Sequence, residues 1–153
     1  MTKPFLDILY HLSHETGLQL YPDDHGACKL KLSNQMNVQL ELDLRSPSLF
    51  LVCNIASLPP GTFRENVLKH ALYANHFEDS TSGILCYIEK LGALALCKTI
   101  PIQDLHSDHL LDQISLMGEK AEKWKKAIDQ SQPAPFVMNQ GSSSLPSPNK
   151  MMN

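Results

Sequence analysis

The sequence lacks the long apolar run and the positive charge that would place it in a membrane or on nucleic acid. No stretch reaches the roughly 18 apolar residues that a membrane-spanning helix requires, and the N-terminal residues lead straight into an amphipathic pattern, unlike a secretory signal. The net charge is -3, so the chain as a whole lacks the basic field that binds phosphate backbones. We therefore expect a cytoplasmic protein that does not insert into a membrane and has no nucleic-acid partner.

Motifs for catalysis and for metal or nucleotide binding are also missing. The chain contains no G-x-x-x-x-G-K-[ST], no G-x-G-x-x-G, no H-E-x-x-H and no C-x-x-C. The histidine pairs His11/His14 and His106/His109 have no accompanying ligand run, which favours solvated histidines over a metal site. The cysteines lie in separate apolar stretches, which is typical of buried reduced thiols: Cys28, Cys53, Cys86 and Cys97. We expect no enzymatic activity, no cofactor and no metal; a small enzyme with a histidine or cysteine site is the alternative of that class.

The chain is long enough for one domain with a real core. It has 153 residues, of which 42% are hydrophobic. Apolar periodicity ends near Gln130, and prolines, serines and a glycine take over. Such a segment cannot bury enough apolar surface to offset about 1–2 kcal/mol of backbone entropy per residue. We predict a folded domain over residues 1–129 and a disordered tail over residues 130–153.

Three helices are predicted from apolar spacing and end signals. The first spans about residues 3–16, with Gly17 at the position of a C-terminal cap. The second begins at a capping box formed by Thr62 and Glu65 and ends near residue 76. The third has the longest apolar stripe, in steps of four and three residues, and Trp124 is its expected core anchor. Its members are Leu110, Ile114, Met117, Ala121, Trp124 and Ile128.

Five strands are predicted between these helices. Apolar and polar residues alternate over residues 28–32 and 36–44, which indicates two half-buried antiparallel strands joined by a hairpin near residues 33–35. A third strand over residues 49–55 is apolar on both faces, and two short strands follow over residues 84–88 and 93–100. The expected fold class is therefore α+β: a sandwich in the order helix, three strands, helix, two strands, helix, with a largely antiparallel sheet.

The chain has more apolar surface than a single small core is expected to bury. Phe50 and Val52 lie opposite the core face of the third strand, and the second helix has a broad apolar face. Exposed apolar patches usually mark partner surfaces. We favour a symmetric homodimer, with an ordinary monomeric core as the alternative.

Several local motifs, in their order along the chain, resemble a known family. They are Gly17-Leu18, Gly26-Ala27-Cys28-Lys29-Leu30, Ser57-Leu58-Pro59, Tyr73-Ala74-Asn75-His76-Phe77, Ser82-Gly83-Ile84-Leu85, Pro101 and Ala121-Glu122-Lys123-Trp124. Over about residues 4–128 the chain resembles the class I type III secretion chaperones, which include the Tir and YopE chaperones.

The resemblance implies a homodimeric virulence chaperone that binds the N-terminal segment of one or more secreted effector proteins in extended form and keeps them competent for export. It implies effector contacts on the first helix and first three strands: Leu6, Leu9, Phe50 and Val52, with Val38 and Leu40 as candidates that the strand pattern also assigns to the core. It implies dimer contacts on the second helix: Val67, Leu68, Ala71 and Ala74. The secretion ATPase or its sorting apparatus is a further candidate partner.

A different non-enzymatic class remains as the alternative function. A dimeric adaptor or regulator would dock folded partner proteins, through the tail or elsewhere, and would not prefer unfolded N-terminal segments.

Overall fold

The computed structural model describes residues 3–43, 45–103, 105–132 and 135, and it confirms the predicted fold class. The elements are α1 (Lys3–Thr16), β1 (Ala27–Lys31), β2 (Asn37–Asp43), β3 (Ser48–Ser57), α2 (Thr62–Phe77), a short 3-10 helix η1 (Ser80–Ser82), β4 (Ile84–Ile88), β5 (Ala93–Pro101) and α3 (Ser107–Asp129). Apart from residues 130–132 and 135, the predicted tail lies outside the described residues.

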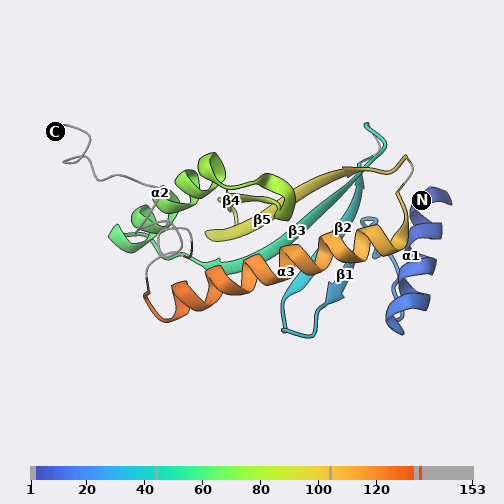
Figure 1. Ribbon diagram of the computed structural model, residues 1–153, viewed down its shortest axis with the longest axis horizontal. Helices are drawn as coiled ribbons and strands as arrows, with labels where there is room; N and C mark the ends of the chain where they lie inside the picture. The colour runs from blue at the N-terminus through green and yellow to red at the C-terminus, as the bar shows by residue number, and fades with distance from the viewer. Residues whose placement is uncertain (1–2, 44, 104, 133–134, 136–153) are drawn as a thin grey trace.

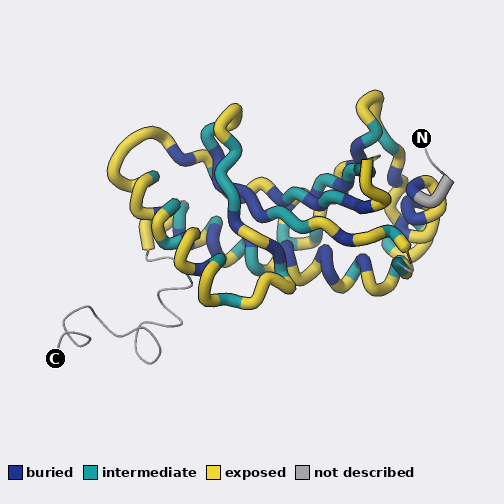
Figure 2. Tube along the Cα trace, turned by 90° about the horizontal axis from the view of Figure 1, so that it is seen from above, coloured by how far each residue is buried: buried dark blue, intermediate teal, exposed yellow. Residues whose placement is uncertain are grey.

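The five strands form one antiparallel sheet in the order β1-β2-β3-β5-β4. In the central strand β3, Leu49, Leu51 and Cys53 are buried on one face, whereas Phe50 and Val52 on the other face are only half-buried. Figure 2 shows the same alternation of buried and more exposed positions along the strands. The period of two gives the sheet a core face and an open face.

Helix α3 lies against the core face of the sheet, runs roughly along β3 and makes most of its sheet contacts there (Figure 1). The predicted stripe is confirmed, since its first five members are buried and Ile128 packs partly against the core. Trp124 is among the largest fully buried side chains. Helix α1 lies near the N-terminal end of α3 (Figure 1), and Ser107 of α3 donates a hydrogen bond to Glu15 of α1, with Oγ to Oε1 at 2.7 Å.

The tip of the β1–β2 hairpin rests on the middle of α3. Asn34 Nδ2 donates to the carbonyl of Gly118 (3.2 Å) and to Glu122 Oε2 (2.9 Å). A methyl group at position 118 would lie 2.3 Å from Leu32 Cδ1, well inside van der Waals contact. The missing side chain of Gly118 is therefore what lets the hairpin approach the helix so closely.

Helix α2 lies along the outer edge of β4. Asn75 Nδ2 donates to the carbonyl of Leu85 (2.8 Å), and the amide of Leu85 donates to Asn75 Oδ1 (2.9 Å). In the first turn of the helix, Arg64 Nη1 donates to the hydroxyl of Tyr87 (3.1 Å). The Asn75 bonds replace hydrogen bonds that another strand would make to Leu85, and the Arg64 contact adds a side-chain link, so α2 covers this edge of the sheet.

The predicted capping box at the start of α2 was wrong. The N-cap is Gly61, no side chain hydrogen-bonds the cap, and Thr62 is already helical. A capping box needs its hydroxyl residue at the N-cap, one position outside the helix. By contrast, Gly17 has a left-handed φ of 73° and its amide donates to the carbonyl of Ser13 (2.9 Å), as predicted for the end of α1.

Candidate functional site

A group of large apolar side chains is exposed on α1 and on the loop that follows it. We call these residues the α1 patch: Leu6, Tyr10, Leu18 and Tyr21. Tyr10 is 70% exposed and Tyr21 is 72% exposed. Leu6, Tyr10 and Tyr21 line one hollow, together with Leu20 and Pro22. Exposed apolar groups concentrated in one place are the usual sign of a partner surface.

The end of α1 positions the loop half of this patch. Ser13 Oγ donates to the carbonyl of Leu9 (2.8 Å) and accepts from the amide of Leu20 (3.1 Å). Thr16 Oγ1 donates to the carbonyl of Leu12 (2.7 Å) in the same way. The loop is thereby held against the helix, which keeps Tyr21 beside Tyr10.

An Asx turn then directs the chain into β1. Asp23 Oδ1 accepts hydrogen bonds from the amides of His25 and Ala27, both at 2.9 Å, and the amide of Asp23 donates to the carbonyl of Ala27 (2.7 Å). The bonds from the Ala27 and His25 amides hold the pKa of the Asp23 carboxyl below its ordinary value, because they stabilise the charged form. The α1 patch and the start of β1 are therefore joined by a structured turn.

Strand β1 is the open edge of the sheet. Its only strand neighbour within the described residues is β2, and no described helix is bonded along its outer side in the way that Asn75 of α2 is bonded to β4. Cys28 and Leu30 are buried, while Lys29 and Lys31 are exposed on the other face. The two edges of the sheet therefore differ: α2 covers the edge at β4, whereas β1 is available to pair beyond Ala27, whose amide and carbonyl are bonded to Asp23.

The sheet face opposite α3 carries a second, flatter apolar area. Phe50 lines a hollow there together with Ile84, Cys86, Cys97 and Thr99. Val52 pairs with Cys97 and Gln39 in neighbouring strands, so it lies on the same face. We call this surface the open sheet face.

The structure separates the predicted effector-binding residues into two groups. Leu6 is exposed on α1, and Phe50 and Val52 are half-buried on the open sheet face. Three others are buried: Leu9, Val38 and Leu40. Of these, Leu9 still forms part of the wall of the hollow that Leu6 and Tyr10 line. Pairing of Val38 with Cys53 and of Leu40 with Leu51 puts both β2 residues on the face that α3 covers. Leu9 belongs to the buried stripe of α1.

Sequence analysis missed most of the α1 patch. Tyr10 follows Leu6 by one helical turn, so these two residues form a second stripe beside the core stripe. That spacing was a usable signal. Leu18 and Tyr21 lie in a loop, where no periodicity marks them, and only the fold brings them next to α1.

The predicted dimer residues mostly face the chain's own core. Val67, Ala71 and Ala74 are buried against the sheet, and only Leu68 of the four is half-exposed. One turn beyond Leu68, Leu72 is 72% exposed. The apolar surface of α2 that a second chain could reach is therefore the flank formed by Leu68 and Leu72, beside the buried face.

Two of the thiols, Cys53 and Cys97, are poorly suited to nucleophilic chemistry. Burial raises the pKa of Cys53 to about 11. Burial, followed by the neighbouring Cys86 thiol, raises the pKa of Cys97 to about 12. A thiol attacks as the thiolate, and these environments keep it protonated.

The described part of the chain contains no group of three or more histidine, cysteine or acidic side chains placed to hold a metal ion. Within the same residues, no helix is both long and apolar enough to cross a membrane.

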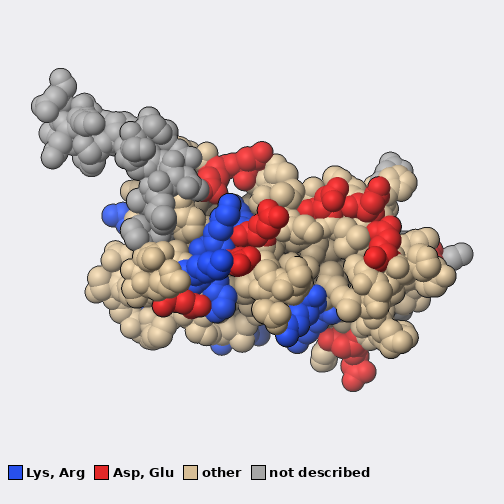
Figure 3. Space-filling model, turned by 60° about the horizontal axis from the view of Figure 1, so that its bottom comes forward, with Lys and Arg blue, Asp and Glu red and all other residues tan. Residues whose placement is uncertain are grey.

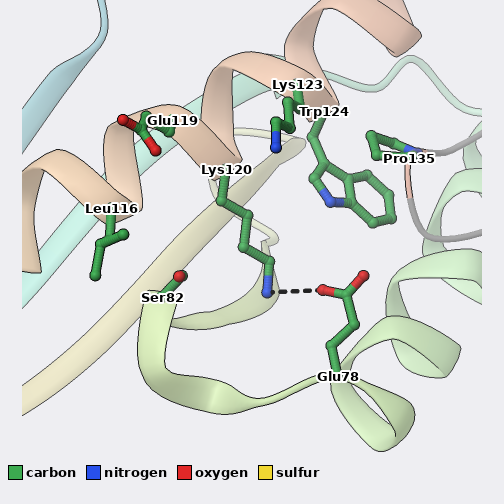
Figure 4. Close-up of a pocket in the computed structure, with 8 residues that line it drawn as sticks. All are labelled: Glu78, Ser82, Leu116, Glu119, Lys120, Lys123, Trp124 and Pro135. Carbon is green, nitrogen blue, oxygen red and sulfur yellow. Dashed lines mark ion pairs between the residues drawn. The ribbon is translucent and has the colours of Figure 1, made fainter. Parts of the chain in front are cut away.

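Another hollow lies beside Trp124, between α3 and the connection from α2 to β4 (Figure 4). Lys120 Nζ forms an ion pair there with Glu78 Oε2 at 3.3 Å. This ion pair joins α3 to the segment that follows α2. On the face shown in Figure 3, basic and acidic side chains lie close to one another and do not form one broad patch of a single sign.

Comparison with known families identifies the class of protein. The family model described as the Tir chaperone protein (CesT) family matches residues 7–125. The match spans α1 to the last turns of α3, and the chain belongs to this family. No curated protein matches the sequence at a significant level.

Several solved structures share the fold of this chain. A chain of the HopA1-SchA chaperone-effector complex is 22% identical, with a TM-score of 0.66, and the alignment covers 81% of this chain and 94% of that one. A chain of the ExsC-ExsE complex is 20% identical, with a TM-score of 0.63 and coverage of 80% and 91%. A chain of the Yersinia pestis type III secretion chaperone SycH in complex with a fragment of YscM2 is 17% identical, with a TM-score of 0.60 and coverage of 76% and 96%.

Proposed function

We propose that this chain is a cytoplasmic type III secretion chaperone that binds the N-terminal segment of one or more effector proteins in extended form and performs no chemistry itself. Family membership supports the class of function. The observation that carries the proposal is the free part of the β1 edge at Lys29 and Lys31, which a short structured turn joins to the α1 patch, because an extended peptide needs both backbone partners and apolar pockets.

The two features suit the two halves of such an interaction. Backbone groups on the outer side of β1 can pair with a peptide strand whatever its sequence, and the hollow lined by Leu6, Tyr10 and Tyr21 can receive its larger apolar side chains. Tyrosines are well adapted to this role, since they offer a large contact area with few torsions to immobilise. Phe50 and Val52 on the open sheet face extend the apolar area that a longer peptide could cover.

We further propose that the working form is a homodimer joined through the flank of α2 formed by Leu68 and Leu72. Leu72 is 72% exposed, and Phe63, Tyr73 and Phe77 of the same helix are exposed as well. A concentration of exposed apolar side chains on one element is typical of a partner surface. A symmetric dimer would place the two copies of this flank against each other.

Co-expression with candidate effectors of the same genome tests the binding proposal. We expect a complex of two chaperone chains to one effector by light scattering, with amide exchange slowed in β1 and in the effector's N-terminal segment. The double change Tyr10→Asp and Tyr21→Asp should weaken binding at least about tenfold, since aromatic anchors dominate such interfaces. Leu91→Asp is the matched control, because Leu91 is also exposed but lies in the turn before β5. Capture of folded partners only would favour the adaptor instead.

Sedimentation of two α2 variants tests the dimer. Leu72→Asp should give a folded monomer, because the side chain has few contacts within its own chain. Val67→Asp should misfold instead, since Val67 is 8% exposed and lies in the core. A dimer that survives Leu72→Asp would remove this flank from the interface.

A further inference from the structure

The open edge of the sheet carries two lysines in a regular arrangement. Lys29 and Lys31 are two residues apart in β1 and point to the same face, the one opposite α3. Residues at this spacing lie about 7 Å apart along a strand. Alternate residues of a strand paired with β1 have the same spacing, so two of them would lie opposite Lys29 and Lys31.

Neither lysine has a charged partner across the strand. Lys29 pairs with Gln39, and Lys31 pairs with Asn37, both of which are neutral. The amide of Gln39 is itself bonded to Glu41, with Nε2 to Oε1 at 2.6 Å. No ion pair involves either lysine within the described residues.

Besides Glu41, which lies diagonal to Lys29 across the strand pair, the Asp23 carboxylate lies close enough to act on Lys29. The charge of Lys29 contributes to lowering the pKa of Asp23, but it is the smallest of the contributions, and the hydrogen bonds of that carboxylate go to the amides of Ala27 and His25. Asp23 occupies the outward backbone groups of Ala27, because its Oδ1 accepts from the Ala27 amide and its own amide donates to the Ala27 carbonyl. The outward backbone groups of Lys29 and Lys31 have no such partner among the described residues. Two positive charges therefore remain at the pairing edge.

These charges discriminate between the strands that could pair there. A second copy of β1 placed antiparallel along the edge would set lysine against lysine, and like charges directly opposite each other destabilise a strand pair. Lysine on an edge strand is a common defence against such self-pairing. The same charges attract a strand that presents acidic side chains at alternate positions.

Resting on the function proposed above, we infer that the effector segment paired with β1 is an extended strand with acidic residues at two alternate positions, i and i+2. The acidic side chains lie opposite Lys29 and Lys31, on the face away from α3. The intervening residues point to the other face, on the side of the buried Cys28 and Leu30. The edge thus selects its partner by charge while the backbone pairing stays independent of sequence.

Three synthetic peptides test the inference. They share alternating apolar residues and differ only at the intervening positions, which are Glu, Gln or Lys. Two opposite-charge strand pairs are worth about 2- to 30-fold in affinity, so the Glu peptide should bind more tightly than the Gln peptide by this factor, and the Lys peptide should bind weakest. The difference should shrink when salt is raised from about 0.05 to about 0.5 M, because exposed charges are screened. Amide shifts in β1, followed by NMR, show whether the peptide occupies the edge.

Charge reversal in the protein provides the decisive comparison. The double change Lys29→Glu and Lys31→Glu should invert the order of the Glu and Lys peptides, and it should leave the fold intact because both side chains are exposed. The double change Lys90→Glu and Lys123→Glu alters the net charge equally at exposed sites away from β1, and it should leave the order unchanged.

Two results would overturn the inference in distinguishable ways. If all three peptides shift the β1 amides with equal affinity, the edge binds peptides and the charge selection is refuted. If an effector segment binds the chaperone and none of the β1 amides responds, the pairing edge of the proposed function is refuted together with the selection.

Discussion

Replacing Gly118 with alanine has two opposing effects on the free energy of unfolding: a gain in helix propensity and a steric clash with Leu32. Alanine is favoured over glycine in a helix interior by about 1 kcal/mol. The added methyl group would lie 2.3 Å from Leu32 Cδ1, and carbon atoms need about 3.5 Å or more. Leu32 or the hairpin tip must therefore move by more than about 1 Å, and overpacking of this kind typically costs about 1–3 kcal/mol. We expect a net loss of about 0–2 kcal/mol in the free energy of unfolding.

A double-mutant cycle with Leu32→Ala isolates the clash. Without the leucine side chain, Gly118→Ala should stabilise the protein by about 1 kcal/mol, so the two backgrounds should differ by about 1–3 kcal/mol. Urea unfolding followed by the fluorescence of Trp124, the sole tryptophan, measures both values at one fixed protein concentration. Ser115→Ala at an exposed position of the same helix is the control for helix propensity alone. Equal stabilisation by Gly118→Ala in both backgrounds would refute the close approach of the hairpin.

Four other predictions concern stability and thiol chemistry. Asn75→Ala should lower the free energy of unfolding by about 1–3 kcal/mol, because it leaves the amide and carbonyl of Leu85 without partners. Urea unfolding measures this loss, and amide exchange in β4 should become faster. Unchanged exchange would show that α2 does not cover that edge. At pH 8 the Cys53 thiol, whose pKa is raised to about 11, should react with iodoacetamide about 100-fold more slowly in the folded protein than in the unfolded one. Because its folded pKa is raised, Cys53 stabilises the fold fully below about pH 9, and this contribution is lost as the pH rises towards 11; Cys53→Ala should flatten that decline, whereas an identical pH profile would contradict it. Trp124→Ala should lower the free energy of unfolding by about 3–5 kcal/mol, since the side chain is 1% exposed. Thermal melting followed by near-UV circular dichroism measures this loss.

Sequence patterns were most informative where one physical requirement acted alone. The apolar stripe of α3 and the alternation of β1 and β2 each reflect one face against one core, so their periods appear directly in the sequence. The start of α2 was less readable, because Thr62 and Glu65 satisfy the capping-box pattern while Gly61 provides the actual N-cap. The spacing of residue types cannot distinguish these two starts.

The site was predicted less completely than the fold. Burial alternation correctly identified Phe50 and Val52 as lying away from the core face, but the same alternation places Val38 and Leu40 on the core side of the sheet. The buried face of α2 was assigned to a partner because an apolar helical face looks the same whether it packs on its own sheet or on a second chain.

The sequence by itself determined the order of helices and strands, the core residues of α3, the break after Gly17 and the resemblance to the secretion chaperones. These properties depend on local periodicity and on short motifs. Only the tertiary structure decided which sheet edge is covered, because Asn75 meets Leu85 through the packing of α2 on β4. It also decided that Tyr21 joins Tyr10 in one hollow and that the hairpin rests on Gly118. Such contacts join residues distant along the chain, and no local pattern encodes a distance between separate elements.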